Sequence, residues 1–134
     1  MIEGVVYNWL SGASAVTNVV ADRIHHEQKP QDEREASIVI GEADIEPIHS
    51  HVGDAGWSRG RLRINVFADD KAMANSLANA CRAVVDNQRG VTVNSVKVGR
   101  FEVVRVASIP REPQPGKQRQ VFGYLLDCDF ITIE

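Results

Sequence analysis

The first third of the chain carries apolar side chains at helical spacing. Five apolar residues between Ile2 and Leu10 recur at intervals of three and four, which places them on one face of a helix that Gly12 can end. Residues 13–20 continue an apolar spacing and predict a second, shorter helix. Residues 23–26 read as extended chain, and a polar loop follows.

Alternation of apolar and polar positions then replaces the helical spacing and predicts strands. A further amphipathic helix interrupts the strands, because Asp69 or Asp70 can cap its start and Gly90 follows its end. Its apolar stripe consists of Met73, Leu77, Ala80, Cys81 and Val84. The predicted strands cover residues 36–45, 59–67, 91–98, 101–109 and 124–130.

The order of these elements predicts the fold class. Consecutive strands with no helix between them favour antiparallel pairing. We therefore expect an α+β fold with a mainly antiparallel sheet of about four to five strands and two to three helices packed on one face. A chain of 134 residues is expected to form a single domain, residues 1–134.

Charges at every second position predict the register between two strands. Three acids and three arginines are each spaced by two residues, and facing residue numbers in an antiparallel pair add up to a constant, here 105. The same register places Val39 opposite Val66 on the other face. Exposed pairs of this kind contribute only about 0.2 to 1 kcal/mol each, so they specify register more than they stabilise. The predicted pairs are Glu42 with Arg63, Asp44 with Arg61, and Glu46 with Arg59.

Composition narrows the class of protein. The chain is 43% hydrophobic and 25% charged, which is typical of a soluble domain. Cys81 and Cys128 lie far apart without metal-ligand spacing, which argues against a zinc module or a disulfide framework and favours a reducing compartment. Glu3 stands where a signal peptide would be basic, and no apolar run reaches the roughly 20 residues of a membrane span.

Charge is unevenly distributed along the chain. The net charge is −3, of which residues 1–56 contribute −7 and the remainder +4. Either the two halves interleave and their charges mix, or the molecule has two electrostatic faces that attract copies of itself head to tail. The net charge is small and negative, and acids are predicted to face the row of arginines Arg59, Arg61 and Arg63. Both observations argue against dedicated nucleic-acid binding.

The sequence shows no catalytic apparatus. His49, His51 and Asp54 could supply two imidazoles and a carboxylate to a metal, but a His-x-His loop without cysteine or helical His-x-x-x-His spacing is more often solvated. No GxSxG nucleophile elbow and no phosphate-binding glycine loop are present. We therefore expect no enzyme activity, no metal and no cofactor.

Two polar segments are candidate interface regions. Pro47 to Ser58 is a 12-residue connection between two predicted strands, far longer than the two to five residues that a hairpin needs. We expect it to be a flexible loop that orders on assembly, although Trp57 could equally pack on its own sheet. The second segment runs from Pro110 to Gln118. The candidate interface residues are Ile48, Val52, Trp57, Pro113 and Pro115.

The whole chain resembles the tail completion proteins of long-tailed double-stranded DNA phages, also called tail terminators or tail-to-head joining proteins. The resemblance covers roughly residues 2–133 and rests on the order of elements and several local phrases. The His-x-His segment and the lack of an aromatic after Ile24 depart from the family pattern. The matching phrases are Ala21-Asp22-Arg23-Ile24, Ser37-Ile38-Val39-Ile40, the strand 61–67 leading into an alanine-rich helix, and the loop 110–116 before the strand 124–130.

This resemblance implies a structural role in a virion. It implies a homo-hexameric ring at the head-tail neck that caps the tail tube, ends its polymerisation and joins it to the head connector or head completion protein. Genome DNA would pass through the lumen without sequence-specific binding, and assembly would occur in the bacterial host cytoplasm without a membrane. The alternative is a small metal-dependent enzyme, such as a nuclease using His49, His51 and Asp54, or a ligand-binding α+β domain.

Overall fold

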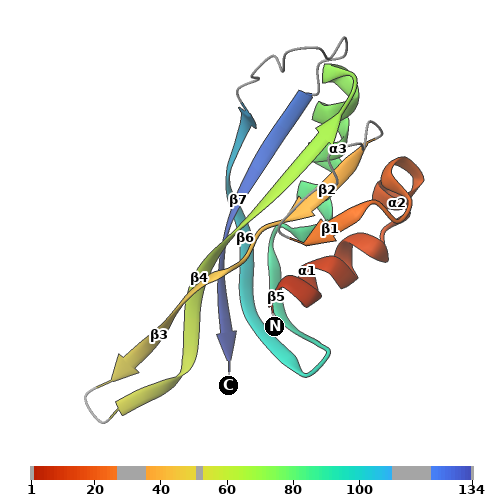
Figure 1. The fold of residues 1–134 in the computed structure, drawn as a ribbon. Coiled ribbons are helices and arrows are strands. Elements are labelled where there is room, and N and C mark those ends of the chain that lie inside the picture. Colours follow the sequence, from red (N-terminus) through yellow and green to blue (C-terminus); the bar gives the residue numbers. More distant parts are fainter. Residues whose placement is uncertain (1, 27–35, 51–52, 110–121, 134) are drawn as a thin grey trace.

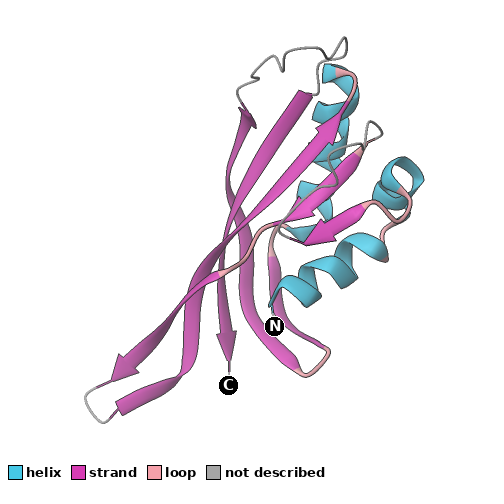
Figure 2. Cartoon of the chain, viewed as in Figure 1, coloured by secondary structure: helices cyan, strands magenta, loops and turns pink. Residues whose placement is uncertain are grey.

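A twisted sheet with helices on one face forms the architecture (Figures 1 and 2). The computed structural model describes residues 2–26, 36–50, 53–109 and 122–133, and the side chains of residues 47–50 and 53–56 lie outside that description. The elements are α1 (Ile2–Ser11), α2 (Ser14–Val20), β1 (Ile24–His26), β2 (Ser37–Ile40), β3 (Asp44–Ser50), β4 (Gly53–Ala68), α3 (Lys71–Val85), β5 (Gln88–Val93), β6 (Val96–Ile109) and β7 (Phe122–Ile133).

The α+β class is confirmed, but the sheet is larger than expected and mixed. Seven strands are described, in the order β1-β2-β4-β7-β6-β5, with β3 also paired to β4. β1 and β2 are parallel, while the other pairs are antiparallel. The sheet exceeds the expected four to five strands because residues 24–26 form the short strand β1 and because the predicted strand 36–45 is divided into β2 and β3. The predicted strand 91–98 is also divided, but its second part joins the predicted strand 101–109 in β6.

The first divided strand is the predicted strand 36–45. β2 pairs with β4 with Ile38 opposite Val66, whereas β3 pairs with the same strand with Asp44 opposite Arg61. The two registers differ by one residue, and residues 41–43 absorb the difference. The predicted pairing of Val39 with Val66 is therefore wrong. Since every residue from 38 to 40 is apolar, the pattern does not reveal which of them face the core.

The second divided strand is the predicted strand 91–98. Asn94 and Ser95 have φ of 49° and 68° and form the turn of a hairpin between β5 and β6. Two consecutive residues with positive φ are the signature of a type I′ turn, whose twist matches the flanking strands. Asn-Ser is a weaker signal for this turn than Asn-Gly. The alternating residues on both sides are typical of strand and gave the prediction of one continuous strand.

The expected loop from Pro47 to Ser58 is also wrong, because most of this segment is strand. β3 continues to Ser50 and β4 begins at Gly53, with His49 opposite Asp54 in the backbone pairing. β4 pairs with β7 only from residue 57 onward, so the end of the hairpin is two-stranded. Figure 1 shows this hairpin projecting past the layer of helices.

The core lies between the helices and the even-numbered residues of β4 and β7. The ring of Trp9 from α1 packs edge-on against Phe101 of β6 at 5.3 Å, and Phe101 stacks on Phe130 of β7 at 6.2 Å. Burial of such side chains is the main source of stability. Fully buried members include Val5, Val6, Leu10, Ile38, Ile40, Ile64, Leu77, Cys81, Leu126 and Cys128.

Two carboxylates from the helices satisfy the backbone where the sheet is irregular. Glu3 of α1 accepts a hydrogen bond of 2.9 Å from the amide of Ala43, next to the register change. Asp86, which follows α3, accepts a 2.9 Å bond from the amide of Val103, where the β6–β7 register shifts. An amide that loses its ladder partner costs about 1–3 kcal/mol when buried and unpaired, so these bonds stabilise the irregularities.

Gly60 marks the closest approach between β4 and its surroundings. A Cβ at this position would lie 2.7 Å from Cζ of Phe130 and even closer to the backbone oxygen of Asp44. We predict that Gly60→Ala lowers the free energy of unfolding by about 1–3 kcal/mol or more, measured by chemical denaturation. Gly4→Ala is the control, because nothing lies within 4 Å of its Cβ and alanine favours a helix interior by about 0.5–1 kcal/mol. Equal stability of the two variants would contradict this packing.

Candidate functional site

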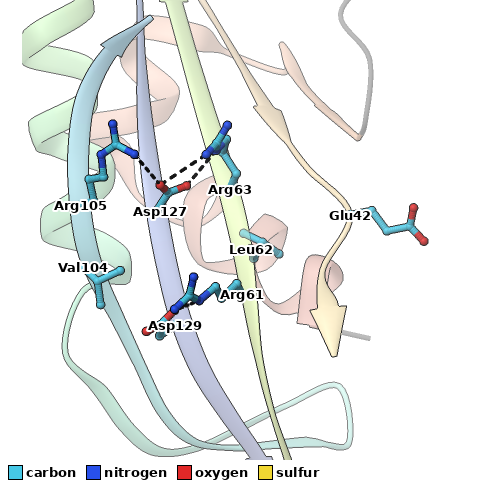
Figure 3. A pocket seen from close by; sticks show the side chains of 8 residues that line it. All are labelled: Glu42, Arg61, Leu62, Arg63, Val104, Arg105, Asp127 and Asp129. Carbon is cyan, nitrogen blue, oxygen red and sulfur yellow. Dashed lines mark hydrogen bonds and ion pairs between the residues drawn. The ribbon is translucent and has the colours of Figure 1, made fainter. Parts of the chain in front are cut away.

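The helix-free face of the sheet carries a band of charged residues. On β4 and β7 the even-numbered residues are buried under the helices, so alternation directs the odd-numbered side chains to the other face. Arg61 and Arg63 of β4 thereby lie beside Asp129 and Asp127 of β7, and Arg105 of β6 approaches from the far side (Figure 3). Three neighbouring strands therefore contribute to one charged surface.

Asp127 is the centre of this charged band. Its Oδ1 accepts a 2.8 Å hydrogen bond from Nε of Arg63, and its Oδ2 lies 3.8 Å from Nη1 of Arg105. The hydrogen bond from Arg63 and the charge of Asp127 together raise the pKa of the Arg63 guanidinium. Asp129 lies 3.2 Å from Nε of Arg61. These pairs are partly exposed, so each contributes at most about 1 kcal/mol, but together they fix the orientation of the side chains.

A shallow hollow of about 410 Å³ opens over this band. Besides the five charged residues, Glu42, Leu62 and Val104 line it. Figure 3 shows Glu42 directed away from the arginines. Each of the three arginines contacts an aspartate, so the hollow offers alternating, mutually compensated charge and no continuous cationic track for phosphates.

The cross-strand prediction agrees with the structure only in part. β3 faces β4 in the predicted register, with Asp44 opposite Arg61 and Glu46 opposite Arg59, and an ion pair of 3.7 Å joins Glu46 to Arg59. Glu42 falls in the register change, outside β3, so its predicted pairing with Arg63 is wrong. Arg61 and Arg63 turn instead to the β7 aspartates.

Sequence reasoning did not identify the two aspartates as partners. Asp127 and Asp129 have the same two-residue spacing as Arg61 and Arg63, so a second charge register was available in the sequence. A central strand has two neighbours, and the predicted register involves the neighbour of β4 that is closer in sequence. The missing information was that β7, some 60 residues later, lies on the other side of β4.

Trp57 lies at the end of the same face. Its side chain is 38% exposed and its backbone is opposite Ile133, which is 48% exposed. On the other side of β7, Lys97 of β6 is opposite Ile133. Trp57 therefore forms part of an exposed apolar patch where the projecting hairpin leaves the sheet. Val52, Pro113, Pro115 and the side chain of Ile48 lie outside the described residues.

Metal and thiol chemistry receive no support from the described part of the chain. Within it, no three His, Cys, Asp or Glu side chains are grouped as metal ligands. His51 and the side chains of His49 and Asp54 lie outside the description. Cys81 and Cys128 are buried in the core, and burial raises the pKa of both thiols to about 12. Neither thiol is therefore a nucleophile at neutral pH.

Among the described helices, none combines the length and the apolar character that crossing a membrane requires.

Comparisons with known proteins identify a family and a shared fold. A family model described as "Tail completion protein gp17" matches residues 4–126. Among solved structures, a chain from the virion of a native gene transfer agent particle has the same fold, with a TM-score of 0.77 over 98% of this chain and 94% of that chain. The two sequences are 13% identical. No curated protein sequence matches the chain.

The buried thiols predict a pH dependence of stability. Unfolded thiols ionise near pH 9.0, whereas the native thiols keep their protons to about pH 12. The unfolded state therefore loses protons first, and the free energy of unfolding falls as pH rises from about 9 to about 12. Urea denaturation at pH 8 and pH 10 should show this fall, and Cys81→Ala should reduce it. Rapid reaction of iodoacetamide with the native protein at pH 8 would show that the thiols are accessible.

Proposed function

This chain belongs to the tail completion protein gp17 family, and we propose that it is the ring-forming terminator at the neck of a phage-type particle. Membership makes it a structural protein of a virion tail. In our proposal a ring of about six copies caps the tail tube, ends its polymerisation and joins it to the head connector or head completion protein. The family match over residues 4–126 carries this proposal.

The charged band supports a surface that DNA passes without being held. Free arginines in a row would bind successive phosphates and slow a moving duplex. Here Asp127 and Asp129 contact Arg61, Arg63 and Arg105, so only one of the three positive charges is left over. We therefore assign the helix-free face to the lumen of the ring and the helices to its outside. Genome DNA would then move past a surface of nearly balanced charge.

In this proposal the packed helices and sheet hold the surfaces that contact other proteins in place. The helices cover one face of the sheet, and their contacts fill the core. The remaining surfaces are the helix-free face, the strand edges and the projecting β3–β4 hairpin. Contacts with tube and head proteins would therefore fall on the two ends of the sheet, and we propose that residues 1–134 act as one unit.

The test of this proposal is the mass of the assembly and the length of the tails. Native mass spectrometry of the purified chain, alone and with tail tube protein, should show a ring of about six copies. Particles made without the protein should have unattached tails of irregular length in electron micrographs. A chain that stays monomeric in both samples, with normal tails in its absence, would overturn the proposal. A monomer stabilised by zinc or manganese would instead support the metal-dependent alternative.

Trp57 gives a residue-level prediction. Its exposed apolar surface fits an interface anchor, and truncating such anchors typically costs 2 kcal/mol or more of binding energy. We predict that Trp57→Ala weakens ring formation or docking by at least about tenfold while the monomer stays folded, measured by sedimentation and circular dichroism. Met73→Ala, 47% exposed on α3, is the matched control and should leave assembly unchanged. Unfolding of the Trp57→Ala monomer would instead show that Trp57 belongs to the core.

A further inference from the structure

In the half of the sheet that carries the β3–β4 hairpin, the two outer strands lack a second partner within the described residues. There β3 pairs with β4 alone, and β5 pairs with β6 alone. Both lie in the same half of the sheet, since β3 flanks residues 53–61 of β4 and β5 flanks residues 96–101 of β6. An open edge presents unpaired backbone amides and carbonyls, which is a template for another strand.

The two edges carry opposite charge. Asp44 begins β3 with an exposed side chain that has no ion-pair partner among the described residues, and Glu46 is 73% exposed with one long contact to Arg59. On the other edge Arg89 is exposed, and within the described residues its side chain donates to Oδ1 of Asn87 alone, at 3.0 Å. Lys97, beside β5, likewise has no ion-pair partner in the part of the chain described. Among the described residues, these charges without an ion-pair partner therefore lie on or beside opposite edges of the sheet.

The register places an acid of one edge and a base of the other at the two ends of one row of facing residues. Glu46 is opposite Arg59, Arg59 is opposite Ile131, Ile131 is opposite Arg100, and Arg100 is opposite Arg89. Glu46 on β3 and Arg89 on β5 thus stand level, four strands apart. When two copies are placed side by side at the same height, the acid of one meets the base of the next.

Strand direction is also compatible with such an arrangement. Each step from β3 through β4, β7 and β6 to β5 is antiparallel, so β3 and β5 run in the same direction. Copies related by rotation about a ring axis keep the same direction along that axis. A contact between β3 and β5 is therefore parallel and heterologous, and heterologous contacts that repeat by rotation close into rings.

We propose that the β3 edge of one copy pairs with the β5 edge of the next, so that the sheets of the ring join into one continuous barrel. The occupant of each edge is a second copy of this chain, recognised by parallel backbone pairing and by Asp44 and Glu46 against Arg89. This inference rests on the proposed ring and adds its subunit contact. Closure also covers these two edges, which protects them from nonspecific strand addition.

Disulfide trapping tests the contact directly. Within one chain, residues 46 and 89 are separated by four strand spacings, about 19 Å, which exceeds the limit of about 7 Å for a disulfide. Any bridge in the double variant Glu46→Cys/Arg89→Cys must therefore join two copies. The native Cys81 and Cys128 are buried and are not expected to form disulfides with another copy. Mild oxidation of the assembled protein should give a ladder of covalent multimers up to the full ring on denaturing gels. Glu46→Cys/Lys71→Cys, with its second thiol on α3, should give no ladder.

Charge reversal provides a second, independent measurement. Asp44→Lys/Glu46→Lys and Arg89→Glu should each raise the dissociation constant of the ring at least about tenfold, because like charges then meet across the contact. Combining the three substitutions should restore assembly. Lys71→Glu reverses an exposed base on the helix side and should change nothing.

The outcomes separate this inference from the proposed function. A wild-type ring without a disulfide ladder, and insensitive to reversal at both edges, overturns the β3–β5 contact and leaves the terminator proposal standing. Failure of combined reversal to restore the ring likewise counts against the contact. A wild-type chain that forms no ring with or without tail tube protein overturns both proposals. A ladder together with charge rescue supports the contact.

Discussion

One edge of β4 has to pair with two different strands whose registers differ by a single residue. β2 meets one half of β4 and β3 meets the other, and residues 41–43 absorb the shift. A one-residue slip exchanges the two faces of a strand, so the break lets Ile38 and Ile40 face the core while Asp44 and Glu46 face away from it. The carboxylate of Glu3 bonds the amide of Ala43 and so stabilises the break.

The two-faced sheet follows from this constraint. One face holds the helices and the aromatic stack around Phe101, and the other holds the paired charges of β4, β6 and β7. Because Asp127 contacts two arginines and Asp129 a third, two of the three positive charges of this band are compensated within the subunit. Among the described residues, Asp44 on β3 and Arg89 on β5 have no ion-pair partner, and in our proposal a neighbouring copy supplies it.

Family membership and geometry are complementary arguments here. The family match identifies a tail completion protein, which is a structural component, and the fold similarity at 13% identity adds the architecture alone. The described residues contribute the physical basis: a face without a free cationic track, two complementary open edges and a hairpin that extends beyond the helices (Figure 1). Together they support our proposal of a ring whose wall is the sheet.

The sequence by itself determined the helices, the α+β class and the register of Asp44 and Glu46 with β4, because helical spacing, alternation and charge spacing are local signals. It also contained the phrases that resemble the family. Only the tertiary structure decided that the segment 47–58 is largely strand, that the uniformly apolar residues 38–40 belong to a shifted register, and that Arg61 and Arg63 pair with β7. These features depend on which distant strands become neighbours, and the chain pattern does not decide between a partner close in sequence and one some 60 residues away.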